Sequence, residues 1–136
     1  MDKIWKKVVN LAEKAYKKDE VPIGCVVVYK NEIVGTGYNQ KKRKNVCTAH
    51  AEIIAIEKAG KKLKDWRLED CQLYVSLKPC DMCMEVIRQA RIKEVFYLID
   101  SHFDNEKRKN IKYLKTENEY TNKCLAILKN FFKNKR

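Results

Sequence analysis

Two short motifs bring together residue types that bind metals and move protons. His50-Ala51-Glu52 supplies an imidazole and a carboxylate, and Pro79 precedes two cysteines, Cys80 and Cys83, three residues apart. Histidine nitrogen and cysteine sulfur are zinc ligands, and three protein ligands leave one tetrahedral position for water, as in catalytic zinc sites. We therefore predict that His50, Cys80 and Cys83 bind one zinc ion. Glu52 is the predicted catalytic residue, because a carboxylate beside that water can transfer its protons. These roles indicate a hydrolytic reaction.

The same residues allow two other kinds of site. A Cys-x-x-Cys pair is also typical of thioredoxin-like redox proteins. With Cys47 or His102 as a fourth ligand, the cluster becomes a structural zinc site. A redox pair does not need a His-Ala-Glu segment upstream, and a structural site gives Glu52 no role. The catalytic zinc site is therefore the favoured interpretation.

Both motifs fall where helices are predicted to begin. Thr48 is a good N-cap for a helix over 49–62, which places His50 in its first turn. Cys80 stands at the start of a helix over 81–90 that carries Cys83. The positive end of a helix dipole favours the thiolate form that zinc binds. The spacing of three residues places both sulfurs on one helix face.

The remaining elements follow from apolar periodicity. Residues 2–18 show helical spacing, and a final helix carries the stripe Leu125, Leu128, Phe131 and Phe132. Strands are predicted over 24–29, 33–38, 72–77, 94–99 and 111–114. Gly35 and Gly37 in the second strand indicate close packing or a bulge. We predict a single domain over residues 1–136, an α/β protein of three layers (α/β/α). Its mixed five-stranded sheet has an antiparallel opening hairpin, parallel later strands and helices on both faces.

The composition and net charge indicate which binding partners and which cellular compartment to expect. The 136 residues are 45% hydrophobic and 35% charged, and no apolar run approaches the ~20 residues that cross a bilayer. We expect a cytoplasmic protein with reduced cysteines and no membrane association. The net charge of +12 favours a nucleic acid partner, and a lysine-rich solvated surface is the alternative. Lys41-Lys42-Arg43-Lys44 is predicted to be an exposed basic loop.

Beyond the His-x-Glu and Pro-Cys-x-x-Cys signature of zinc-dependent deaminases, the chain resembles the bacterial tRNA-specific adenosine deaminases. The matching segments run in family order over residues 1–99, and the last helix with its Phe-Phe pair is also similar. These segments are Glu20–Gly24, Gly37–Asn39, Thr48–Ile53, Asp65–Leu68, Leu73–Leu77, Pro79–Cys83 and Ala90–Ile92.

The resemblance implies a cytidine deaminase-like fold and the zinc-dependent hydrolysis of adenosine to inosine at the wobble position, position 34, of tRNA. It implies a homodimer that binds the anticodon stem-loop near the subunit boundary. It also implies substrate contacts: a hydrogen bond from Asn39 to the flipped base, and a pocket formed in part by Val21 and Pro22. Phe131 and Phe132 are expected to stack or pack near RNA. Alternatively, Asn39 forms a turn, and at least one of the two phenylalanines belongs to the core face of the last helix.

The chain departs from the family pattern at three places. Lys78 stands where the family usually has Glu, Glu85-Val86 replaces Gly-Ala, and residues 100–105 replace an Asp-x-Lys, glycine-rich segment. These changes leave the ligands and Glu52 in place and bear on the substrate. The rival functions are a deaminase of a free base or nucleoside (guanine, cytosine or cytidine) and a non-catalytic, zinc-stabilised RNA-binding subunit. A cationic surface argues against the first, and the presence of Glu52 argues against the second.

Overall fold

A five-stranded mixed sheet forms the centre of the molecule, which a computed structural model describes for residues 2–135. The strand order is β2-β1-β3-β4-β5. The strands are β1 (Gly24–Tyr29), β2 (Glu32–Tyr38), β3 (Cys71–Leu77), β4 (Glu94–Ile99) and β5 (Lys112–Lys115). β1 pairs antiparallel with both β2 and β3, and β3, β4 and β5 run parallel. The predicted antiparallel hairpin and parallel later strands are confirmed.

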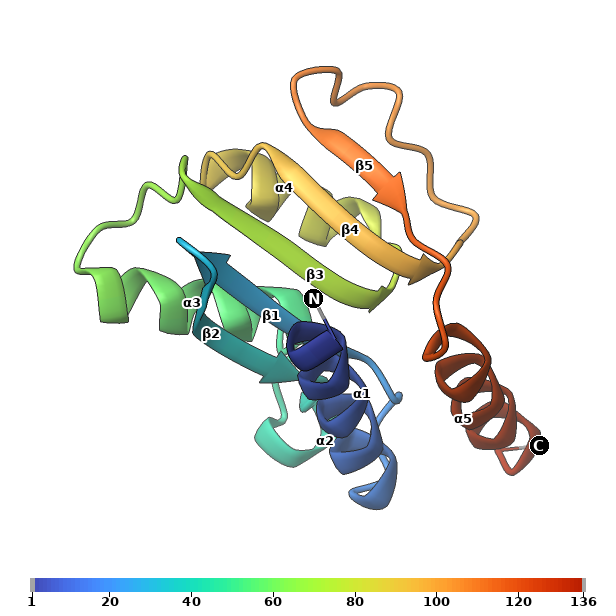
Figure 1. Cartoon of the computed structure of the whole chain (residues 1–136). Helices are drawn as coiled ribbons and strands as arrows, with labels where there is room; N and C mark the ends of the chain where they lie inside the picture. The colour runs from blue at the N-terminus through green and yellow to red at the C-terminus, as the bar shows by residue number, and fades with distance from the viewer. Residues whose placement is uncertain (1, 136) are drawn as a thin grey trace.

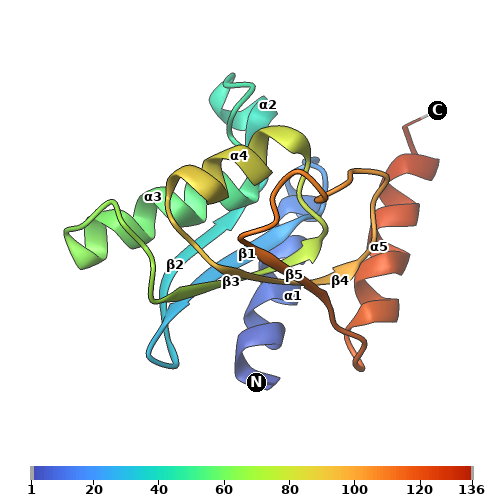
Figure 2. The same ribbon diagram turned by 90° about the horizontal axis from the view of Figure 1, so that it is seen from above.

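Helices cover both faces of this sheet (Figures 1 and 2). α3 (Ala51–Leu63) and α4 (Asp81–Gln89) lie on one face, and α1 (Asp2–Lys17) and α5 (Thr121–Lys133) lie on the other. The predicted three-layer α/β/α fold is therefore confirmed. The parallel connection from β4 to β5, residues 100–111, contains no helix and passes beside α4 (Figure 2).

Alternating strand residues build a separate core on each face, as the period of two requires. Cys25, Val27, Leu73 and Val75 point to the α3–α4 side and are fully buried there. Val26, Val28, Tyr74 and Leu98 point to the α1–α5 side. Trp5 of α1 meets the ring of Tyr74 edge-on at 5.3 Å between centroids. The two cores hold the helix starts against the sheet without any contribution from the candidate metal ligands.

Two glycines of β2 let α3 approach the sheet closely. A Cβ atom on Gly37 would lie 2.2 Å from the carbonyl oxygen of Ala51, and one on Gly35 would lie 2.2 Å from that of Ala55. Real side chains do not tolerate such separations, so any larger residue would displace the helix. The predicted close packing is confirmed, and the start of α3 is fixed by it.

Most predicted boundaries lie within one residue of the observed ones, and two predictions differ by more. Residues 41–44, predicted to be a loop, form the short helix α2 (Lys41–Lys44). The helix predicted from residue 49 begins at Ala51, because residues 46–49 form a turn in which Ala49 donates to the carbonyl of Val46. His50 is therefore the N-cap residue of α3 and does not lie in its first turn. No helix in residues 2–135 has the length and apolar character needed to cross a bilayer.

Candidate active site

Three metal-binding side chains from two helix starts meet in one place. The Nδ1 atom of His50 lies 3.7 Å from the Sγ of Cys80 and 3.4 Å from the Sγ of Cys83. All three ligand atoms lie within 4.8 Å of one another. His50 is half-buried and Cys83 is fully buried. The residues predicted to bind zinc are thus brought together although 30 residues separate the two motifs.

The helix starts explain why these side chains converge. His50 is the N-cap residue of α3 and Cys80 is the N-cap residue of α4, and both have extended backbone conformations. An N-cap side chain usually accepts a hydrogen bond from its own helix, but neither of these does. Each side chain therefore points away from its helix and toward the other motif.

The cluster fits a zinc ion in both chemistry and spacing. Zinc binds sulfur at ~2.3 Å and nitrogen at ~2.0–2.1 Å with tetrahedral angles, which separates a sulfur and a nitrogen ligand by roughly 3.5 Å. The measured separations of 3.4 and 3.7 Å match this value. Within residues 2–135, neither Cys47 nor His102 joins the group, so no fourth protein ligand closes the site. An open position is the mark of a catalytic site and not of a structural one.

Glu52 lies one residue into α3 and is 4% exposed. Burial raises the pKa of its carboxyl group to about 7, against the opposing effects of its backbone hydrogen bond, His50 and the thiol of Cys83. A hydrogen bond from Cys83 lowers the pKa of Cys80 to about 3, so Cys80 carries a thiolate. A hydrogen bond with Cys80 in turn raises the pKa of His50. The arrangement combines an ion-binding set with a carboxyl group that can hold or release a proton at neutral pH.

Asn39 has a structural partner beside its predicted role. Its side-chain oxygen Oδ1 accepts a hydrogen bond of 2.8 Å from the backbone N–H of Ala51, the first residue of α3. The residue is 4% exposed, and its side-chain nitrogen donates to no other residue in 2–135. The oxygen thus anchors the helix start that carries His50, and the amide nitrogen stays available to a bound base. The base contact remains a prediction.

The other predicted substrate residues lie in two regions. Val21 is half-buried and Pro22 is buried, and the adjacent Ile23 carbonyl accepts the N–H of Asn39, so this segment lies beside the site. Phe131 and Phe132 stand on α5. Phe131 is buried at 8% exposure, whereas Phe132 is 53% exposed. One phenylalanine therefore belongs to the core, as the alternative interpretation allowed, and the other is free to meet a partner.

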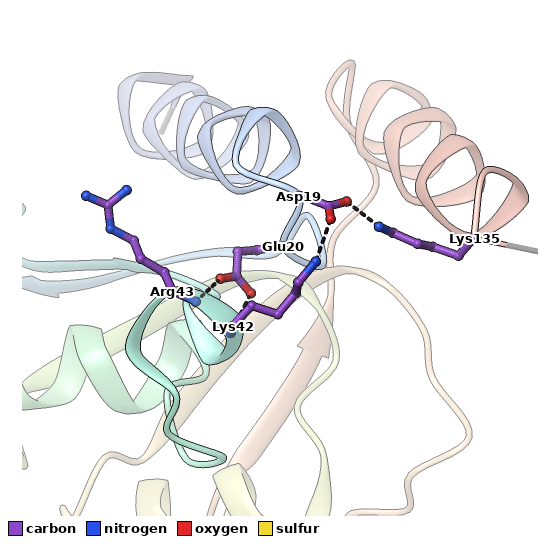
Figure 3. Close-up of polar contacts among 5 residues, drawn as sticks. All are labelled: Asp19, Glu20, Lys42, Arg43 and Lys135. Carbon is purple, nitrogen blue, oxygen red and sulfur yellow. Dashed lines mark hydrogen bonds and ion pairs between the residues drawn. The ribbon is translucent and has the colours of Figure 1, made fainter.

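Asp19 and Glu20, to which the sequence assigned no role, contact the basic residues of α2 (Figure 3). Glu20 is buried at 3% exposure, and its carboxylate oxygens accept the backbone N–H groups of Lys42 at 3.2 Å and Arg43 at 2.8 Å. Asp19 forms ion pairs with the Nζ atoms of Lys42 and Lys135. Glu20 thus holds the start of α2, and Asp19 links α1, α2 and the end of α5. The sequence signal for these contacts was the pair Asp19-Glu20, which directly follows the lysines at the end of α1.

Lys78, which departs from the family pattern, is largely buried beside the site. Its Nζ lies 3.9 Å from Asp100 and 5.6 Å from the ring centre of Tyr97. Asp100, the residue directly after β4, supplies the carboxylate that faces this cation.

Comparison with known proteins agrees with this geometry. The model of the MafB19-like deaminase family matches residues 1–136. A tRNA-specific adenosine deaminase from Buchnera aphidicola subsp. Schizaphis graminum is 39% identical, over 99% of this chain and 96% of that protein.

Solved structures show the same fold. One, described as a study of A-to-I editing by tRNA:A34 deaminases at the wobble position of transfer RNA, has a TM-score of 0.78 and 29% identity, covering 85% of this chain and 98% of the other. A guanine deaminase from Bacillus subtilis has a TM-score of 0.68 and 30% identity, covering 95% of this chain and 93% of the other. The chain therefore belongs to the MafB19-like deaminase family and to the tRNA-specific adenosine deaminases.

Proposed function

We propose that this protein hydrolyses adenosine to inosine at the wobble position, position 34, of a tRNA anticodon and releases ammonia. The observation that carries this proposal is the convergence of His50, Cys80 and Cys83 next to the buried Glu52. The family membership and the 39% identity to a tRNA-specific adenosine deaminase over nearly the whole chain support the choice of substrate. The net charge of +12 fits an RNA substrate.

His50, Cys80 and Cys83 would hold the cofactor, one zinc ion in each subunit. Zinc bound there lowers the pKa of water to ~7 and supplies a hydroxide nucleophile at neutral pH. Glu52 accepts the proton that the water loses and donates a proton to the ring nitrogen beside C6 of adenine. After the attack at C6, the Glu52 carboxylate would take the remaining proton from the new C6 hydroxyl group and pass it to the amino group, which leaves as ammonia while the C6 carbonyl of inosine forms. Glu52 can serve both steps because it is not one of the three ligands.

The substrate contacts follow from the same elements. We propose that the amide nitrogen of Asn39, which donates to no residue in 2–135, donates to the purine, and that the segment with Val21 and Pro22 forms the adjoining wall. Phe132 offers an exposed ring on which an RNA base can stack. We further propose that the enzyme acts in the cytoplasm as a homodimer that binds the anticodon stem-loop.

Sequencing of tRNA tests this function directly. Total tRNA is sequenced before and after treatment with the purified, zinc-loaded protein, since inosine is read as G. We expect A-to-G changes at position 34 with wild type and none with Glu52→Gln, which should keep its zinc. Loss of this proton transfer should cost ~10²–10⁴-fold in rate or more.

The same protein is assayed for ammonia release from free adenosine, guanine, cytosine and cytidine. Ammonia release from guanine without any A-to-G change in tRNA would show that the substrate is a free base and not tRNA. Activity of Glu52→Gln within about tenfold of wild type would show that another group transfers the protons.

A further inference from the structure

A small cavity lined almost entirely by cations lies apart from the metal-ligand cluster. It has a volume of about 160 Å³ between the end of α4, the start of β4 and the segment that leads into β5. Its other lining residues are uncharged, and no carboxylate lines it. The charged residues of this cationic cavity are Arg88, Arg91, Lys93, Lys107, Arg108 and Lys109.

Four of these six charged side chains form no ion pair within residues 2–135. Arg88 is neutralised by hydrogen bonds to the carboxylate of Glu85. No carboxylate in the described part of the chain pairs with the four exposed cations, Arg91, Lys93, Lys107 and Lys109. Like charges gathered around a concave surface repel one another and attract anions. The cavity is therefore poised for a negatively charged ligand.

Arg108 adds an unsatisfied donor to the wall of the cavity. Its side chain is 14% exposed, with Nη1 3.6 Å from the Asp81 carboxylate and Nη2 donating to the Asp81 carbonyl at 3.4 Å. Its Nε atom is buried and has no acceptor in residues 2–135. Buried N–H groups are nearly always hydrogen-bonded. Arg108 therefore adds a sixth positive charge to the lining, and its Nε lacks the acceptor that such a group normally has.

The place and size of the cavity identify the ligand class. α4 begins beside Cys80 and reaches the cavity at its other end, and nine residues at a rise of 1.5 Å separate the two by roughly 13 Å. A base in the active site cannot reach that far. A volume of about 160 Å³ is enough for a phosphate group.

We infer that the cationic cavity binds a phosphate group of the tRNA backbone outside the anticodon stem-loop, and that it provides a second attachment point for the substrate. This inference rests on the proposed function for the identity of the RNA. The lysines of the cavity act as point charges, and Arg91 adds an exposed guanidinium group that can hydrogen-bond a phosphate oxygen. The site increases affinity without contacting the reacting base.

Binding of two RNAs tests the inference. Full-length tRNA and its isolated anticodon stem-loop are titrated with zinc-loaded protein by fluorescence anisotropy over a range of salt concentrations. The site variant carries Lys93→Gln, Lys107→Gln and Lys109→Gln, all at exposed positions. The matched control carries Lys3→Gln, Lys6→Gln and Lys7→Gln, which remove the same charge from the exposed face of α1.

We expect the site variant to lower the slope of log K against log salt for full-length tRNA by about 2 relative to the control. Its affinity for the stem-loop should equal that of the control. Equal slopes with full-length tRNA would overturn the inference, and so would a matching loss of stem-loop affinity. The proposed function is tested separately, because the site variant should still form inosine in the stem-loop.

Inorganic pyrophosphate distinguishes a free anion from RNA. Its effect on the thermal unfolding of wild type and site variant is compared with that of sodium chloride at equal ionic strength. Stabilisation of wild type alone supports phosphate recognition. If pyrophosphate stabilises wild type alone while the site variant and the control bind full-length tRNA equally, the ligand is a free phosphate compound and the RNA assignment is wrong.

Discussion

At the scale of single residues, the main finding is that two proposed metal ligands are N-cap residues that do not cap. His50 and Cys80 occupy positions whose side chains normally serve their own helix ends, and both instead point toward Cys83. The backbone at each helix start therefore fixes the position from which the side chain of His50 or Cys80 extends. We therefore propose that the ligand set is organised before an ion binds.

Replacement of one ligand should remove the ion while leaving the fold intact. Cys83→Ser keeps nearly the same volume in a fully buried position but weakens the bond to zinc. We expect zinc, measured by elemental analysis, to fall far below one ion per chain, and deamination to be lost with it. Cys47→Ser changes an exposed cysteine outside the cluster and should affect neither. Full zinc occupancy in Cys83→Ser would disprove the ligand assignment.

Asp19 provides a pH dependence of stability whose sign is fixed by its ion pairs. Hydrogen bonds from Lys135 and Lys42 lower the pKa of its carboxyl group from 3.8 to about 2. An acid whose pKa is lower in the folded than in the unfolded state stabilises the fold at pH values above its unfolded-state pKa. For Asp19 this stabilisation disappears as the pH falls from about 4 to about 2. Urea unfolding of wild type and Asp19→Asn should therefore give midpoints that differ near neutral pH and converge near pH 2. The gap should be small, since exposed ion pairs are weak.

Asp70→Asn serves as the control for this measurement. Asp70 is also exposed but forms no ion pair within residues 2–135. Its midpoint should differ little from that of wild type at any pH. A gap between wild type and Asp19→Asn that persists unchanged to pH 2 would show that the carboxylate charge is not the cause.

At the scale of elements, the close packing of α3 on β2 sets the position of His50 and Glu52. Gly37→Ala should push the Ala51 carbonyl away and displace the helix start that carries His50. Overpacking of this kind costs typically ~1–3 kcal/mol. We expect a lower free energy of unfolding together with weaker zinc binding, measured by chelator competition.

Gly60→Ala is the matched control, because Gly60 lies in α3 at a position with room for a methyl group. Its Cβ would lie 3.5 Å from the Asp65 carbonyl, an ordinary contact. The added methyl group should stabilise α3 by roughly 0.5–1 kcal/mol with unchanged zinc affinity. If both substitutions change stability alike, close packing against β2 does not position the helix.

The sequence predicted the elements with apolar periodicity and failed where a distant partner decides the structure. Residues 41–44 contain four cations and no apolar residue, so no periodicity marked α2. Its start is held by the Glu20 carboxylate, 22 residues before Lys42. The start of α3 was placed two residues early because Thr48 is a good N-cap, whereas Asn39 selects Ala51 by hydrogen bonding to its N–H.

The ligand cluster was predictable because zinc requires particular residues at particular spacings. The cationic cavity was not, since its members come from separate segments in a chain with 30 basic residues. Among so many lysines and arginines, only the fold shows which of them converge.

At the scale of the whole molecule, the excess of positive charge predicts salt-dependent RNA binding. Each neutralised phosphate releases counterions, so log K should fall linearly with log salt. Lys42 is already paired with Asp19, which leaves Lys41, Arg43 and Lys44 of α2 available. Replacement of these three by Gln should reduce the slope for the anticodon stem-loop by about 2–3. Zinc content should not change, and a slope equal to wild type would mean that α2 does not contact RNA.

The helix-free connection to β5 has a consequence for the dynamics of the molecule. β5 has four residues, lies at the edge of the sheet and buries none of its side chains fully. Elements with few buried contacts open by local unfolding at a lower free energy than the core. In hydrogen–deuterium exchange we expect the amides of residues 107–115 to exchange well before those of β1 and β3. The end of the sheet that frames the cationic cavity would then be a separate cooperative unit, free to open and close while α3 and α4 stay folded.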